Sequence, residues 1–245
     1  MTREEFSNSF DVLLNSYKNK PIFGDSFDVT NIALDEYEKS VFLTKAQEEV
    51  VVNLYNGKNI YGDSFESTEE IRRYLDSLVK TKVYYNADKI VDSDSEESPT
   101  HIKLSDSSIM FALPEDIAFI TLEQIKYSDE SLGCANGSIA SVYPVTHDEY
   151  EVIKNNPFRG PTKYKAIRID YGEKIVELIS KYNIGEYLIK YLSKPKPIVL
   201  EDLPDNLSIE GQTEAADCEL NPILHNTILT RAVQLAVVSR GSKSE

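Results

Sequence analysis

The stretch NPILHNTILTRAVQLAVVSRG, residues 221–241, decides how the C-terminal part of the chain folds. Asn221 is a favoured helix N-cap, and Pro222 suits the first helical position, where its missing N–H costs nothing. Gly241 suits the end of a helix. We therefore predict a helix over residues 222–240. Its apolar residues extend around most of the helical surface, which is typical of a helix buried on several sides. This pattern fits a central core helix within one subunit, and it also fits a helix that packs partly against a neighbour.

An acidic segment at residues 201–219 leads into this helix. It contains no Lys or Arg and seven acids, which are Glu201, Asp202, Asp205, Glu210, Glu214, Asp217 and Glu219. Residues 154–196 have the opposite balance, because ten Lys and Arg against four acids give +6 in a chain whose formal net charge is −15. Identical subunits that join head to tail through two unlike surfaces can close into rings. One interpretation is therefore that the basic stretch of one copy binds the acidic segment of the next. The other is that these charges alternate on solvent-exposed strand faces.

The candidate contact residues on these segments are Lys190, Lys194 and Lys196 on the basic side, and Glu201, Asp202, Asp205 and Glu210 on the acidic side. A further candidate is the NPFRGP loop, residues 156–161, where two prolines and a glycine restrict the path of the chain around Phe158 and Arg159. Such a loop can present an aromatic ring and a guanidinium group to a partner. It can equally serve only to turn the chain between a helix and a sheet.

Helix-start signals dominate the first third of the chain. A Ser or Thr followed three residues later by Glu or Gln forms a capping box, which opens a helix. The pairs are Thr2 with Glu5, Thr44 with Gln47, Ser67 with Glu70 and, further on, Thr146 with Glu149. Asn56-Gly57 ends the second of these helices. Residues 35–43 are compatible with a further helix or with an extended lead-in.

The middle of the chain has the short apolar runs of β-strands. The runs cover residues 82–85, 101–104, 109–113, 117–125, 138–145, 164–170, 174–180, 187–192 and 198–201. Tyr171-Gly172-Glu173 is a hairpin signal, so the sheet is expected to be mainly antiparallel. The predicted fold class is α+β, with a helical N-terminal region at residues 1–80. Residues 81–245 form the α+β domain, with an exposed acidic loop at 92–99 and the closing helix.

Composition excludes several classes of protein. A formal net charge of −15 opposes sequence-specific binding to DNA, which depends on Lys and Arg contacts to phosphates. No run reaches the length of about 18–20 apolar residues that crosses a bilayer, and the polar N-terminus does not match a secretory signal. Cys134 and Cys218 are far apart, which favours free thiols in a cytosolic setting. We expect no membrane association and no metal.

No catalytic constellation stands out. The chain has no Gly-x-Ser-x-Gly elbow, no phosphate-binding Gly-rich loop and no metal-ligand spacing among its three histidines. Pairs of neighbouring carboxylates such as Glu115 and Asp116 arise by chance in a chain with 41 acids. We therefore predict that the protein is not an enzyme and uses no cofactor.

Five segments together resemble the virion structural proteins of crAss-like phages, which are short-tailed phages of gut Bacteroidales. The segments are TKAQEEVV (44–51), LYNG (54–57), PFRGP (157–161), LPDNL (203–207) and CELNPILH (218–225). Within that group the chain is most similar to ring or head–tail connector proteins below the portal. The resemblance extends over nearly the whole chain and involves no catalytic motif.

This resemblance implies a subunit of a homo-oligomeric collar of about twelve copies around the DNA exit channel. Its partners would be the portal and other ring or tail proteins, with DNA passing only as non-specific cargo. The protein would be assembled in the cytoplasm of the bacterial host and located in the virion. Two other classes remain open: a monomeric or dimeric binding or regulatory module, and an enzyme with an unfamiliar carboxylate site.

Overall fold

The computed structural model describes residues 1–18, 34–58, 62–90, 103–105, 108–156, 158–172, 174–204 and 206–241. The predicted acidic loop at 92–99 and the contact candidate Asp205 lie outside these residues. The chain divides into two structural units: unit 1 contains residues 1–78 and 194–245, and unit 2 contains residues 79–193. The C-terminal segment, which we had grouped with the β-rich middle, therefore packs with the N-terminal helices.

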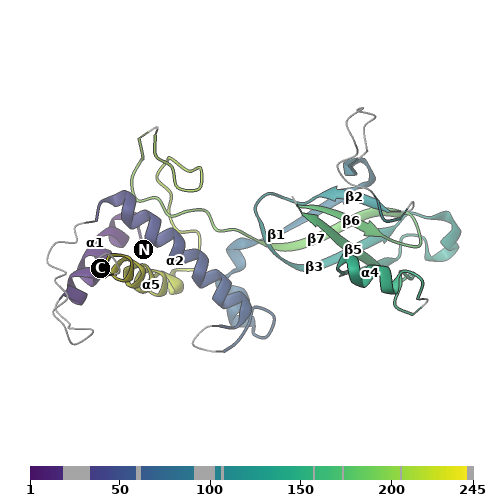
Figure 1. The fold of residues 1–245 in the computed structure, drawn as a ribbon, viewed down its shortest axis with the longest axis horizontal. Coiled ribbons are helices and arrows are strands. Elements are labelled where there is room, and N and C mark those ends of the chain that lie inside the picture. The colour runs from purple at the N-terminus through teal and green to yellow at the C-terminus, as the bar shows by residue number, and fades with distance from the viewer. Residues whose placement is uncertain are drawn as a thin grey trace. The chain divides into compact units, whose positions relative to one another are not determined.

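In its described residues, unit 1 contains the α-helices α1 (Arg3–Lys18), α2 (Glu36–Asn56), α3 (Glu69–Tyr74) and α5 (Pro222–Gly241). In Figure 1, α5 lies alongside α1 and α2, with which it makes direct contacts. Its buried residues recur three or four positions apart, which places them on one broad face; they are Leu224, His225, Ile228, Leu229, Ala232, Val233 and Ala236. Ile223 and Val238 remain exposed. The helix is therefore a core element of its own unit, although it is not buried all round.

Helix starts were predicted with mixed success. The capping box of α1 is confirmed, because the Glu5 N–H donates to the Thr2 hydroxyl and the Thr2 N–H donates to the Glu5 carboxylate. The helix start predicted at Thr44 is wrong. Helix α2 begins at Glu36, where the Asp35 carboxylate accepts a hydrogen bond from the backbone of Glu38 at 2.7 Å. Thr44 lies inside the helix, and its hydroxyl does not cap a helix start but bonds to another segment of the chain.

The remaining caps differ less from the prediction. Thr68, rather than Ser67, is the N-cap of α3, because the Ser67 hydroxyl is used in a turn with Ser64. The predicted caps of α4 at Thr146 and α5 at Asn221 are confirmed, and so is the end of α2 at Gly57.

Unit 2 is a curled seven-stranded sheet with the strand order β1-β7-β3-β4-β5-β6-β2. The strands are β1 (Val79–Tyr85), β2 (Ile109–Ala112), β3 (Ile117–Tyr127), β4 (Ile139–Pro144), β5 (Lys165–Gly172), β6 (Ile175–Ile179) and β7 (Ile184–Ser193). Every pair is antiparallel except β4 with β5. The α+β prediction is confirmed. The predicted strand at 198–201 forms only a single bridge, between Val199 and Ala216. Of the predicted strand at 101–104, only residues 103 and 104 are described, and Leu104 lies in a bend.

The two edges of the sheet meet through aromatic side chains. The rings of Tyr84 on β1 and Phe111 on β2 have centroids 5.4 Å apart, and each also packs against Tyr187 on β7. Since β1 and β2 are the outermost strands, this contact joins the two edges around an apolar interior. Figure 1 shows the curled course of the strands. Helix α4 (His147–Ile153) covers part of the outer face, where Tyr150 and Ile153 pack on Ile167 and Ile169 of β5.

Candidate assembly surfaces

A row of polar side chains on α2 fixes the segment that carries the acidic residues. Ser40, Thr44 and Gln47 are all buried and recur at intervals of four and three residues, so they share one face of the helix. The Leu200 N–H donates to the Ser40 hydroxyl at 3.0 Å, and the Ile198 N–H donates to the Thr44 hydroxyl at 3.1 Å. The Gln47 amide donates to the Lys196 carbonyl at 2.7 Å. The backbone groups of Lys196, Ile198 and Leu200 thus find hydrogen-bond partners among the side chains of α2.

The acidic segment that follows is folded. Val199, Leu203 and Ile209 are buried in a cluster against Tyr37 and Val41 of α2. The backbone of Val199 exchanges two hydrogen bonds with Ala216, and the Leu203 N–H donates to the Thr213 carbonyl at 2.8 Å. The Asp202 carboxylate accepts from the Ala215 N–H at 2.8 Å. The buried apolar side chains anchor one side of the segment to α2. Its other described carboxylates therefore lie on the solvent-exposed side.

A tight turn at Glu210-Gly211 positions one of these carboxylates. Both residues have positive φ, +50° and +84°, and the flanking Ile209 and Gln212 exchange two backbone hydrogen bonds. This is the geometry of a two-residue hairpin turn that normally favours Asn or Gly at the first position. Burial and the adjacent Glu210 carboxylate raise the pKa of Glu48 on α2, while Lys194 acts in the opposite direction.

Two of the three candidate lysines are engaged within their own unit. Lys196 forms an ion pair with Glu219 at 2.6 Å, and Lys194 interacts electrostatically with Glu48. Lys190 belongs to β7 of unit 2, is exposed, and forms no ion pair with any described residue. On the acidic side, Glu201, Asp202 and Glu210 are all exposed. Their role in binding another copy stays a prediction.

The loop at residues 156–160 holds Phe158 away from the protein, with 91% of its surface exposed. The Asn156 side chain accepts from the backbone of Phe158 at 2.9 Å and of Arg159 at 3.2 Å. The loop requires glycine at position 160, because a Cβ at this position would lie only 2.9 Å from the Asn156 carbonyl oxygen. Phe158 and Arg159 are therefore presented by a braced turn, and their role as a contact also stays a prediction.

A buried polar network crosses the interior of the curled sheet. The Arg168 guanidinium pairs with Glu123 at 2.5 Å and with Asp170 at 3.2 Å, and the Tyr187 hydroxyl donates to Glu123. Burial and the Glu123 carboxylate raise the pKa of Tyr187 far above its usual range. Each charged group in this network has a partner, which is the condition for burying charges. The network is structural, because its groups are turned toward each other.

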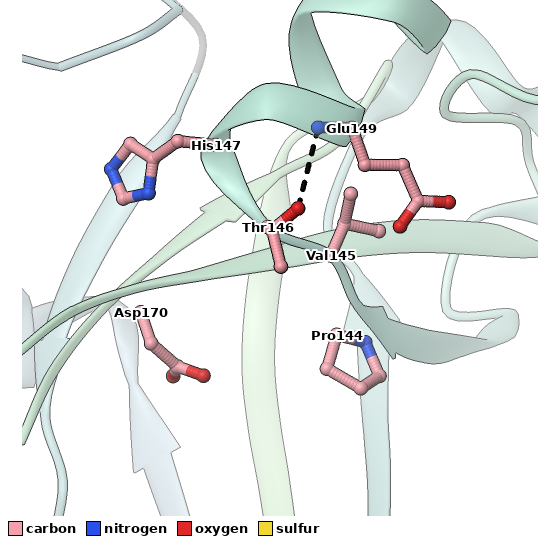
Figure 2. Close-up of a pocket in the computed structure, with 6 residues that line it drawn as sticks. All are labelled: Pro144, Val145, Thr146, His147, Glu149 and Asp170. Atoms are coloured by element: carbon pink, nitrogen blue, oxygen red, sulfur yellow. Dashed lines mark hydrogen bonds between the residues drawn. The ribbon is translucent and has the colours of Figure 1, made fainter.

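Figure 2 shows a pocket of about 300 Å³ at the start of α4, lined by Pro144, Val145, Thr146, His147, Glu149 and Asp170. The one hydrogen bond among these residues is the helix cap, from the Glu149 N–H to the Thr146 hydroxyl at 3.3 Å. His147 packs edge-on against Tyr171, and Asp170 pairs with Arg168. The pocket therefore combines no nucleophile with a base.

Other features of the described residues add no chemical site. Within the described ranges, no group of three or more His, Cys, Asp or Glu residues could hold a metal ion. No helix in the described part of the chain is long and apolar enough to cross a membrane. Cys134 and Cys218 are both free thiols. The surfaces of the molecule, rather than a cleft, carry its distinctive features.

The fold and the family comparison define the class of protein, which is a structural component of a phage virion. The model of the phage tail ring protein 3/4 family matches residues 1–245, so the chain belongs to that family. It is 48% identical over 241 residues to Ring protein 3 of Bacteroides phage crAss001, covering 98% of this chain and 96% of that protein. It is 31% identical over 245 residues to Ring protein 4/5 of the same phage, covering 96% and 92% of the two chains. The resemblance to crAss-like phage ring proteins is confirmed.

Sequence reasoning missed the α2 side chains that hold residues 196–200. Ser40, Thr44 and Gln47 are polar residues on the apolar face of a helix, and that spacing was a usable signal. It was hidden because Thr44 with Gln47 also matches a capping box. The sequence also did not indicate which side chains gather on the outward side of the sheet. Their proximity depends on the register between strands that are distant in the sequence.

Proposed function

We propose that this protein is the subunit of a closed homo-oligomeric ring of about twelve copies in the phage tail, at the head–tail connector through which DNA passes. Membership in the tail ring protein family carries this proposal. The ring is a structural element with no enzymatic role. Its neighbours are the portal and the other ring and tail proteins, and it assembles in the bacterial cytoplasm before it becomes part of the virion.

The charge of the chain supports a role beside moving DNA. With a formal net charge of −15, the protein repels the phosphate backbone on average, so DNA passes a channel wall of this kind without adhering to it. This charge suits a conduit better than a DNA-binding protein.

Ring closure requires two unlike surfaces on each copy. The candidate contacts are Phe158 and Arg159 in the braced loop, Lys190, Lys194 and Lys196 on the basic side, and Glu201, Asp202, Asp205 and Glu210 on the acidic side. Of the lysines, Lys190 is the best placed for another copy, because Lys196 is already paired with Glu219.

The number of copies in purified particles tests this function. Quantitative mass spectrometry with isotope-labelled peptides measures the ratio of this chain to another protein of known copy number. We expect about twelve copies in each particle. One or two copies per particle, or a protein that remains in the lysate as a monomer or dimer, would identify a regulatory or binding module instead.

A further inference from the structure

The outward side of the sheet in unit 2 combines apolar side chains with Lys190, which forms no ion pair within the described part of the chain. Tyr187, Ile189 and Tyr191 of β7 point into the sheet interior, so Leu188 and Lys190 point outward. Lys190 lies directly opposite Leu122 of β3 on one side and Thr81 of β1 on the other. On β4, Ile139 and Tyr143 flank the same face, since Ala140 and Val142 between them are buried. We call Leu122, Ile139, Tyr143, Leu188 and Lys190 the outer sheet patch.

The exposure of this patch is unusual for a sheet face. Leu122, Ile139 and Tyr143 are 43%, 59% and 50% exposed, although they lie within regular strands. On the adjacent part of the same face, Ile167 of β5 pairs with Tyr143 and is fully buried beneath α4. One half of the outer face is thus covered by a helix while the other half is open. Several large apolar side chains exposed on one face, with polar residues such as Gln124 and Ser141 between them, are typical of an interaction site.

The charge of the patch selects its partner. Lys190 and the nearby Lys165, whose ammonium group lies 5.0 Å from the Tyr143 ring centre, form no ion pair with any described residue. Of the described acids on this face, Glu186 is already paired with Lys126 at 3.0 Å, and Glu177 is buried and accepts hydrogen bonds from Ser108 and Tyr171. The patch is therefore apolar and positively charged. A complementary binding partner would present acidic side chains on a backbone that is already ordered before binding.

The acidic segment of a second copy has these properties. Its backbone is fixed by hydrogen bonds, and Glu201 and Glu214 are exposed without an ion pair to any described residue. We propose that the outer sheet patch of one subunit binds the acidic segment 201–219 of the adjacent subunit, and that this is the lateral contact of the ring. The contact is heterologous, as closure requires. Leu122 and Leu188 exclude water around Lys190, which strengthens its attraction to the carboxylates.

This inference rests on the proposed ring, and a cross-linking experiment on intact particles separates the two. A photo-reactive benzoylphenylalanine is placed at Leu122 or at Tyr143 in the full-length chain, and cross-linked peptides are mapped by mass spectrometry. Val152, which is 76% exposed on α4, serves as the control position. We expect cross-links from the patch to residues 201–219 of another copy. Cross-links to a different virion protein, or none from either patch position, overturn the inference while a normal copy number leaves the ring intact.

Charge reversal provides the second test. Lys190→Glu should lower incorporation of the chain into particles about tenfold in competition with the wild-type chain, and Glu201→Lys with Glu214→Lys should do the same. Combining all three changes should restore most of the incorporation, because the two surfaces are again complementary. Lys181→Glu makes the same change of charge in the β6–β7 turn and should have little effect. Failure of the triple variant to recover, with each variant folded by circular dichroism, contradicts the contact.

Discussion

The Thr44 hydroxyl lies 3.1 Å from the backbone nitrogen of Ile198 and 3.3 Å from its carbonyl oxygen, so one helix side chain satisfies both polar groups of a residue 154 positions away. Thr44 and Ile198 are both buried. This contact fixes the start of the segment that carries the acidic residues. It also explains why α2 passes through Thr44 without a break.

Substituting Thr44 tests the importance of this contact. Thr44→Val keeps the shape of the side chain but leaves the Ile198 N–H buried without a partner, which should lower the free energy of unfolding by about 1–3 kcal/mol. Thr44→Ser retains the hydroxyl and is expected to lose less. Urea denaturation of the full-length chain measures both. A smaller loss for Thr44→Val than for Thr44→Ser would show that the methyl group, and not the hydroxyl, matters here.

The closure of the sheet depends on its aromatic residues. Phe111→Ala removes the ring that packs against both Tyr84 and Tyr187 and should destabilise the protein by about 3–5 kcal/mol. Tyr84→Phe is the matched control. The Tyr84 hydroxyl is buried and has no hydrogen-bond partner in the described part of the chain, so its removal should be neutral or stabilising. A large loss of stability in Tyr84→Phe would point to a partner for that hydroxyl.

The buried ion pair gives a third prediction. Arg168→Met leaves the buried Glu123 carboxylate without its cation and should cost about 3–5 kcal/mol. Adding Glu123→Gln should recover much of that loss, because the amide oxygen still accepts from Tyr187 while no charge remains. Lys126→Met breaks the exposed pair with Glu186 and should cost less than about 1 kcal/mol. Denaturant titration compares the three, and a double variant as unstable as Arg168→Met alone would argue against the account.

The contact between Glu48 and Glu210 predicts a pH dependence. Since the pKa of Glu48 is raised above its ordinary value of 4.5, the folded chain holds this proton more tightly than the unfolded chain. The stability that this gives is complete below pH 4.5 and is lost as the pH rises through the raised pKa. Glu48→Gln should therefore stabilise the protein at neutral pH and reduce the decline above pH 4.5.

Substitution of the neighbouring residue, Glu49, is a control that should change the stability in the opposite direction. Glu49 forms a two-point ion pair with Arg231 of α5, at 2.7 Å and 2.8 Å. Glu49→Gln weakens that pair and should lower stability slightly at neutral pH. Thermal unfolding from pH 4 to 8 compares the two variants. If Glu48→Gln also destabilised the protein at neutral pH, the carboxylates of Glu48 and Glu210 would not repel each other.

The sequence predicted local features well and long-range features poorly. The caps at Thr2, Thr146 and Asn221 depend only on residues a few positions apart, and all three were identified correctly. Thr44 matched the same pattern, but its hydroxyl is used by Ile198, which no local rule can reveal. The strand assigned to residues 198–201 is reduced to one bridge for a similar reason, because the Ile198 and Leu200 N–H groups donate to helix side chains and only Val199 pairs with another backbone segment.

The surfaces show the same division. The excess charge of residues 154–196 and 201–219 was visible as composition, yet composition could not show that Lys196 binds Glu219 within one unit. The outer sheet patch is assembled by the register of β1, β7, β3 and β4, so its residues are scattered in the sequence. The exposed Phe158 lies in a loop held by the Asn156 side chain and by the close approach of Gly160 to the Asn156 carbonyl, and the sequence indicated only the role of the glycine.

The most direct test of the central claim is an electron cryo-microscopy map of the intact tail, calculated without imposed symmetry. The account predicts a closed ring of identical copies of this chain around a channel wide enough for DNA. Neighbouring copies should touch through the outer sheet patch and the acidic segment 201–219. A map in which the chain is absent, or in which it occupies a single position off the tail axis, would contradict it.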